Sequence, residues 1–266
     1  MIDLTSDHGG KLGQRAPVRL SHDAPTRRAR AAGPDWPALM IVAFTALFAL
    51  AVWSAMPTEA LMRVMAEDGP VETTTAALFF VLALGMYWLR PQGDDRCTWL
   101  AMAILCAACG AREMDWHKAW TGKSVLKLSF YLESAPMGQK LLALAVLALV
   151  ALCVVYLALR HGRRLWRNLL LREPVAVTVA TLLVATAITK ILDRSINLLA
   201  NDYGVVTAPP IWALVSALEE SIELSLPLMV VLGLWQSLQA RSRAAGGPAG
   251  RLNAVSRSTV SGTWPM

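Results

Sequence analysis

The sequence predicts an all-helical membrane protein that crosses the bilayer about six times, with both termini in the cytoplasm. This prediction depends on the composition of the chain, on six long apolar windows and on the distribution of basic residues. Of the 266 residues, 55% are hydrophobic and 17% are charged, and the mean hydropathy is +0.45. Soluble domains of this size are less apolar, so lipid is expected to be the main solvent of the chain.

Six windows of the sequence are long and apolar enough to cross a bilayer. A transmembrane helix needs about 20 predominantly apolar residues to span the hydrocarbon core. The third and fifth windows end in charged residues, whereas the other four do not. The predicted spans are Trp36–Met56, Val71–Leu89, Cys97–Trp116, Lys140–Leu159, Pro174–Asp193 and Ile211–Leu238.

The basic residues orient these spans. With the N-terminus inside, 17 of the 25 Lys and Arg residues fall in cytoplasmic segments, and Arg160 to Arg172 form a short, strongly basic loop beside an apolar window. Cytoplasmic loops carry such an excess of Lys and Arg. Residues 35–239 are therefore the predicted transmembrane domain, and residues 1–34 and 240–266, which lack a periodic apolar pattern, are predicted to be disordered cytoplasmic tails.

The net charge of +6 does not predict a nucleic-acid partner. The basic residues cluster between apolar runs, where they set topology. Membrane lipids are the expected partners, with other membrane proteins as a further candidate. The expected location is the inner membrane of a bacterium.

Acidic residues gather at the opposite face from the basic ones. Counting about 20 residues from each cytoplasmic end places Glu72 at the outer boundary of the second span and Glu113 in the last turn of the third. The same count places Lys190 and Asp193 in the last turn of the fifth span, and Glu223 about one turn below the outer boundary. A carboxylate at that depth costs a few kcal/mol unless it is paired, protonated or hydrated. Glu223 therefore marks a candidate site at the outer face.

The spacing of these residues suggests how such a site is built. Glu219 and Glu223 are four residues apart and share a helix face, as do Glu113 and His117. Pairs of this kind hold a divalent metal cation, the one candidate cofactor, or relay protons. The predicted catalytic residues are Glu72, Asp193, Glu219 and Glu223; the predicted substrate-binding residues are Arg112, Lys190 and Arg194; and the predicted metal ligands are Glu113, His117, Glu219 and Glu223.

Three functions are compatible with this pattern. Carboxylates beside cationic groups suggest a membrane-embedded enzyme that acts on a lipid or a lipid-linked phosphate. Glu223 and the helix-breaking Pro227 suggest instead a small cation- or proton-coupled transporter. The same charges could also hold helices together in a non-catalytic assembly or scaffold protein. The sequence contains no Walker A or G-x-S-x-G motif that would choose among them.

Overall fold

The computed structural model is helical throughout its regular elements. It describes residues 36–66, 69–88, 95–119, 122, 125, 128–132, 136–204 and 207–245. Both predicted tails lie almost entirely outside these residues. All the helices belong to one compact unit, Ala32–Met266. In chain order they are α1 (Trp36–Ala55), α2 (Thr58–Val64), α3 (Pro70–Trp88), α4 (Arg96–Glu113), α5 (Trp116–Ala119), α6 (Leu128–Leu132), α7 (Met137–Leu170), α8 (Pro174–Tyr203) and α9 (Pro209–Ala245).

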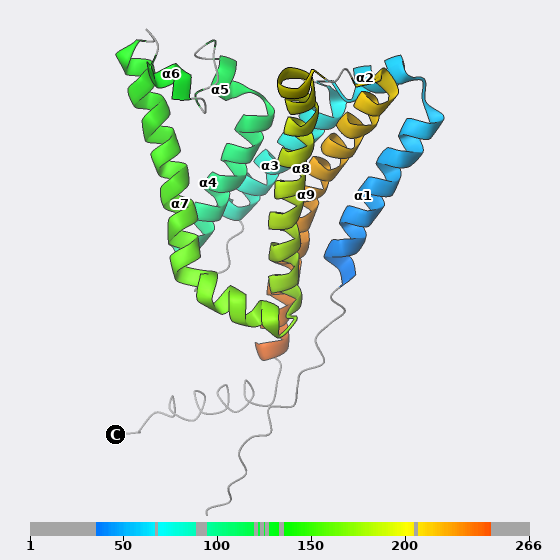
Figure 1. Ribbon diagram of the computed structural model, residues 1–266. Helices are drawn as coiled ribbons and strands as arrows, with labels where there is room; N and C mark the ends of the chain where they lie inside the picture. Colours follow the sequence, from blue (N-terminus) through cyan, green and yellow to red (C-terminus); the bar gives the residue numbers. More distant parts are fainter. Residues whose placement is uncertain are drawn as a thin grey trace, which may run out of the picture. The chain divides into compact units, whose positions relative to one another are not determined.

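The long helices α1, α3, α4, α7, α8 and α9 correspond to the six predicted spans, and three short helices lie at one end of them. Figure 1 shows α2, α5 and α6 at this end, and we call it the α2 end. At the opposite end α1 begins, α9 ends and α7 turns into α8. The chain therefore enters and leaves this helical unit on the same side.

Four helices have the length and composition needed to cross a membrane. Among the described residues these candidate spans are Trp36–Ala55, Pro70–Trp88, Met137–Leu170 and Pro174–Ser195. Large apolar side chains such as Phe44, Val81 and Leu159 are at least 67% exposed, which suits contact with lipid. Helices α4 and α9 are not among the four, and α9 carries three glutamates in its first half. The chain thus has several apolar helices that are compatible with an integral membrane protein.

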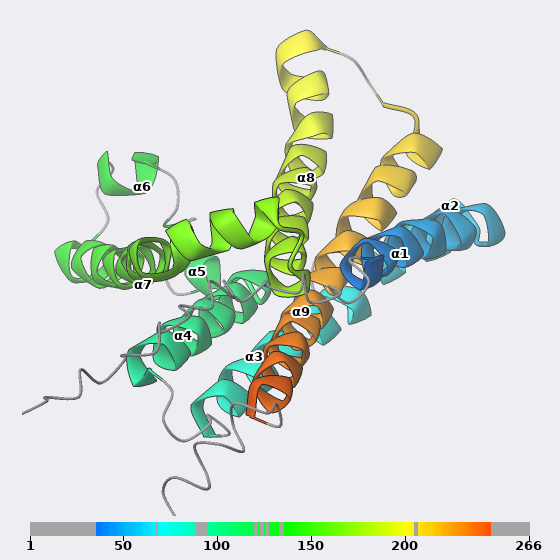
Figure 2. The same ribbon diagram turned by 90° about the horizontal axis from the view of Figure 1, so that it is seen from below.

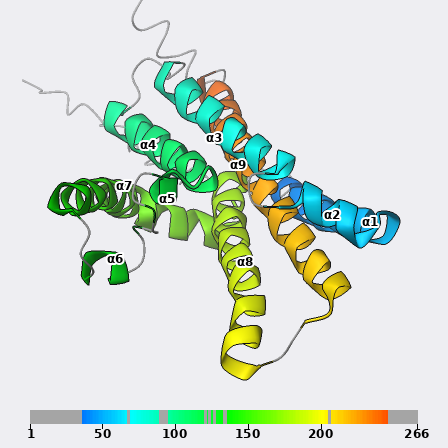
Figure 3. The ribbon, with the colours of Figure 1, turned by 90° about the horizontal axis from the view of Figure 1, so that it is seen from above.

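Helix α9 packs against α1, α2, α3 and α8. Figures 2 and 3, which view the unit from below and from above, both show α9 between α1, α3 and α8. One side of α9 carries small buried residues at four-residue spacing, namely Ala213, Ala217, Ser221 and Ser225. Small side chains let helix backbones approach closely, which is the usual basis of helix packing in membranes.

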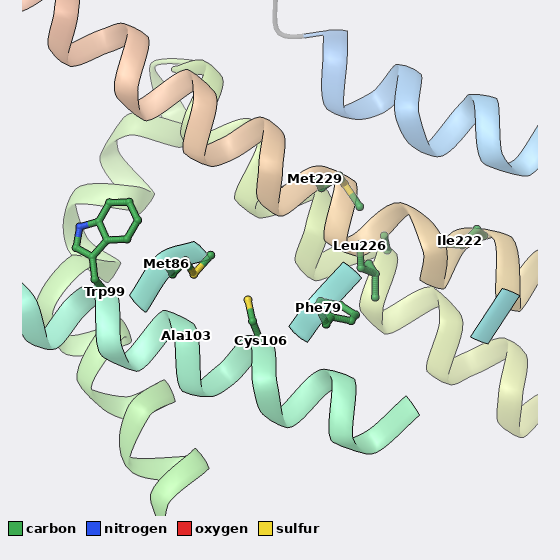
Figure 4. Packing of buried hydrophobic residues seen from close by; sticks show 9 residues of the cluster. Phe79, Met86, Trp99, Ala103, Cys106, Ile222, Leu226 and Met229 are labelled. Carbon is green, nitrogen blue, oxygen red and sulfur yellow. The ribbon is translucent and has the colours of Figure 1, made fainter. Parts of the chain in front are cut away.

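An apolar cluster is formed by residues of α3, α4 and α9, together with one residue of α8. It contains Phe79, Met86, Trp99, Ala103, Cys106, Ala185, Ile222, Leu226 and Met229, most of which are labelled in Figure 4. Along α3 these residues follow Glu72, along α4 they precede Glu113, and along α9 most of them follow Glu223. The cluster therefore lies mainly on the side of the carboxylates that faces away from the α2 end.

Gly110 allows α4 to lie close to α3 one turn before α4 ends. A Cβ atom at this position would lie 3.1 Å from the backbone oxygen of Ala76 and 3.2 Å from the ring of Phe80. The ring of Phe80 also packs against Trp116, with 5.4 Å between the ring centroids. These contacts fix the end of α4, and with it Glu113, against α3.

Candidate functional site

The candidate site consists of charged side chains from α4, α8 and α9. Lys190 Nζ lies 2.8 Å from Glu223 Oε1, and Arg112 Nη2 lies 4.0 Å from the same oxygen. Arg112 Nη1 lies 3.4 Å from Glu113 Oε1. Among the described residues, neither Lys190 Nζ nor Glu223 Oε1 has a partner that meets the geometry of a hydrogen bond. Lys190 and Glu223 therefore attract each other as an ion pair.

The two carboxylates are buried, whereas their cationic partners are not. The side chains of Glu113 and Glu223 are 7% and 5% exposed, and those of Arg112 and Lys190 are 42% and 36% exposed. A buried carboxylate needs paired charge or hydrogen bonds to offset its desolvation. The cations supply that charge. Arg112 also forms the accessible edge of the site, whereas Nζ of Lys190 is buried beside Glu223.

Glu113 and Glu223 interact electrostatically with each other. Both carboxyl groups lie near Arg112, whose guanidinium group is 3.4 Å from Glu113 Oε1 and 4.0 Å from Glu223 Oε1. A hydrogen bond between the two carboxyl groups would require a proton on one of them, because two ionised carboxylates offer only acceptors. The pair can therefore hold one proton between α4 and α9, an arrangement that suits acid and base chemistry.

Further carboxylates surround this pair. Glu219 interacts electrostatically with Asp193, Glu223, Lys190 and Arg112. Glu220 interacts electrostatically with Glu72, Glu113, Glu219 and Glu223. The described part of the site thus contains more acidic than basic groups.

Pro227 changes the backbone of α9 beside the site. Proline has no N–H, so it cannot donate the helical hydrogen bond to the carbonyl of Glu223, four residues earlier. Pro227 is fully buried, and Ser225 Oγ donates to the carbonyl of Ile222 at 2.6 Å. Glu223 therefore contributes both a buried carboxylate and a backbone oxygen that lacks its usual helical donor.

The structure brings most of the predicted site residues into one electrostatic neighbourhood. The predicted residues that interact within it are Glu72, Arg112, Glu113, Lys190, Asp193, Glu219 and Glu223. Arg194 is exposed and makes no ion pair with these residues in the described part of the chain. The structure does not describe the side chain of His117. The catalytic and substrate-binding roles remain predictions.

Glu220 belongs to this neighbourhood although the sequence analysis gave it no role. It is adjacent to Glu219 and three residues before Glu223, so helical spacing places it near the same face as Glu223. That spacing is the signal by which it could have been found.

A metal site is not formed by the residues described. No group of three or more His, Cys, Asp or Glu side chains in the described ranges is arranged to hold a metal ion. The predicted ligand set includes His117, and the structure does not describe the side chain of His117. The metal prediction is therefore not tested.

Comparison with known proteins identifies no relative. No protein-family model matches the chain, and no curated protein or solved structure matches it. The function must therefore be argued from the site.

Proposed function

We propose that this chain is a membrane-embedded enzyme that acts on a lipid or a lipid-linked phosphate at the outer membrane face. The observation that supports it best is the buried Glu113 and Glu223 pair, with the half-exposed Arg112 at its edge and the buried ammonium group of Lys190 beside Glu223. Such a pair can exchange a proton, and cations beside it can bind an anionic group.

Each residue has a defined task in this proposal. The protonated carboxyl group of the pair donates its proton to a leaving oxygen, and the ionised one accepts a proton from the attacking hydroxyl group or water. Arg112 holds the phosphate oxygens by charge-assisted hydrogen bonds, and the buried ammonium group of Lys190 adds positive charge behind it. Glu72, Glu219 and Asp193 add negative charge around the pair. Negative charge nearby favours retention of a shared proton.

The apolar cluster favours an enzyme over a transporter. Transport requires a polar route to both membrane faces, whereas Phe79, Cys106 and Leu226 pack between α3, α4 and α9 on the far side of the carboxylates. A proton- or cation-coupled transporter is the second candidate, because the site has an excess of carboxylates and Pro227 frees the carbonyl of Glu223.

We further propose six membrane crossings with both termini in the cytoplasm of a bacterium, across its inner membrane. The support is that α1 begins and α9 ends on the side where α7 turns into α8 (Figure 1), and that the arginines from Arg160 to Arg172 lie at this turn.

A reporter fused after Met266 tests this topology. A reporter that works only in the cytoplasm should be active, and one that works only after export should be inactive. The opposite pattern would contradict both the even number of crossings and the cytoplasmic assignment of the arginines.

Glu113→Gln tests the enzymatic proposal. Glutamine retains the shape of the side chain but cannot share an acidic proton with Glu223, so activity should fall by about 100-fold or more. Lipid extracts from cells with and without the full-length protein should differ by mass spectrometry, and Glu113→Gln should abolish the difference.

Glu59→Gln is the matched control, because Glu59 is exposed on α2 and outside the site. It should preserve the wild-type lipid profile. A profile unchanged by the wild-type protein itself would contradict lipid chemistry, and cation-dependent uptake into vesicles would then favour the transporter.

A further inference from the structure

Helix α7 is longer than a membrane crossing and bends near its end. It has 34 residues, and the 23 that precede Arg160 extend about 34 Å, enough to cross the hydrocarbon core. Figures 1 and 2 both show the last part of α7 leaving the direction of the earlier part and running toward the start of α8. This last part, residues 160–170, is called the arginine segment below.

The arginine segment has a basic face with an exposed apolar pair at its edge. Arg160, Arg163, Arg164 and Arg167 recur at helical spacing on one face, and Leu165 and Leu169 lie on the opposite face. Trp166 follows Arg163 by three residues and Leu170 follows it by seven, so both lie along the edge of the arginine face. Trp166 and Leu170 are 66% and 68% exposed. A helix with exposed arginines next to exposed Trp and Leu side chains is suited to lie along a membrane surface.

Side-chain contacts attach the start of the segment to α4. His161 Nε2 lies 3.0 Å from Thr98 Oγ1, and Arg160 Nε lies 3.6 Å from Asp95 Oδ2. Tyr156 donates to the same Asp95 oxygen at 2.7 Å. Hydrogen bonds from Tyr156 and Thr98 lower the pKa of Asp95 below its ordinary value of 3.8, so Asp95 is ionised at neutral pH.

The end of the segment is also fixed. Arg172 adopts a positive φ of 52°, and its N–H donates to the carbonyl of Leu169 at 2.9 Å. Pro174 then begins α8. The segment is therefore held at both ends, by α4 and by the turn into α8.

The arginines in the middle of the segment remain available. Arg163, Arg164 and Arg167 are exposed, and in the described part of the chain they take part in no ion pair. Nothing acidic interrupts the sequence from Arg160 to Arg172. Their charge is complementary to anionic phospholipid headgroups, and the exposed Trp166 and Leu170 are complementary to the acyl boundary below those headgroups.

We propose that the arginine segment binds anionic phospholipids of the leaflet opposite the carboxylate site. Arg163, Arg164 and Arg167 contact the phosphate groups, and Trp166 and Leu170 enter the acyl boundary. This inference is independent of the proposed enzymatic function, because it uses none of the residues of the carboxylate site.

Binding of phosphatidylglycerol to the full-length protein tests the proposal. Native mass spectrometry in a neutral detergent should show more bound phosphatidylglycerol than phosphatidylcholine at equal concentrations. Each arginine near a membrane surface contributes about a five-fold change in affinity, so the triple variant R163Q/R164Q/R167Q should bind on the order of 100-fold more weakly. The triple variant R163K/R164K/R167K retains the charge and should bind within a few-fold of the wild type.

Arg63→Gln, on exposed α2, is the control and should bind phosphatidylglycerol like the wild type. The wild-type protein provides a test that does not depend on folding of a variant: raising the salt concentration from about 0.1 M to 1 M should weaken its preference, because salt screens exposed charges. A salt-independent preference, undiminished binding by the triple Gln variant, or equal competition by inorganic phosphate would overturn the proposal.

Discussion

Replacing Glu223 with glutamine should abolish activity and leave the amount of protein in the membrane close to normal. Glutamine is nearly isosteric with glutamate and keeps a polar oxygen beside Lys190, but it carries no charge and no acidic proton. Glu223→Leu should instead lower the free energy of unfolding by about 3–5 kcal/mol. In the wild type Lys190 Nζ lies 2.8 Å from Glu223 Oε1, and the leucine variant leaves this buried cation without its carboxylate.

The two Glu223 variants separate function from folding. Abundance in isolated membranes and thermal unfolding in detergent report the fold, and the lipid profile of cells reports activity. If Glu223→Gln keeps full activity while Glu223→Leu loses abundance, the residue serves only assembly, as a scaffold protein would require. If neither variant changes any readout, the carboxylate site has no role.

Lys190→Met should destabilise the protein by about 3–5 kcal/mol, because among the described residues Glu223 then retains only Arg112, at 4.0 Å, as a cationic neighbour. The double variant Lys190→Met/Glu223→Leu removes both members of the ion pair. It should be more stable than either single variant, since no unpaired charge remains. The measurement is thermal unfolding of the purified full-length variants in one detergent.

Arg63→Met is the control for this series, because Arg63 is exposed on α2 and takes no part in the site. It should change the free energy of unfolding by no more than about 0.5 kcal/mol. Additive losses in the double variant would show that Lys190 and Glu223 stabilise the fold independently and would contradict the ion pair.

The sequence predicted where the long helices lie better than where they end. All six predicted windows correspond to helices in the structure. However, α7 continues past the predicted end at Leu159 to Leu170, and α9 continues past the predicted end at Leu238 to Ala245. Charged residues mark the boundary of the hydrocarbon core, yet arginine is a good helix former, so a helix continues through them. Hydrophobic windows therefore locate the long helices and underestimate their lengths.

The site was predictable only in part, for a similar reason. Four-residue spacing along one helix placed Glu219 and Glu223 on one face. The contact between Glu113 and Glu223 depends on how α4 is positioned against its neighbours, and Gly110 influences that position through its close approach to α3. Spacing within one helix carries no information about the register between two helices.

The apolar cluster between α3, α4 and α9 also has an electrical consequence. Moving one elementary charge across the whole membrane changes its energy by about 2.3 kcal/mol per 100 mV. A proton that reaches Glu223 from the α2 end does not pass Phe79, Cys106 or Leu226, so it crosses only a part of that voltage. Proton exchange at the carboxylate pair should therefore depend only weakly on the membrane potential, and the site can work equally in energised and in de-energised membranes.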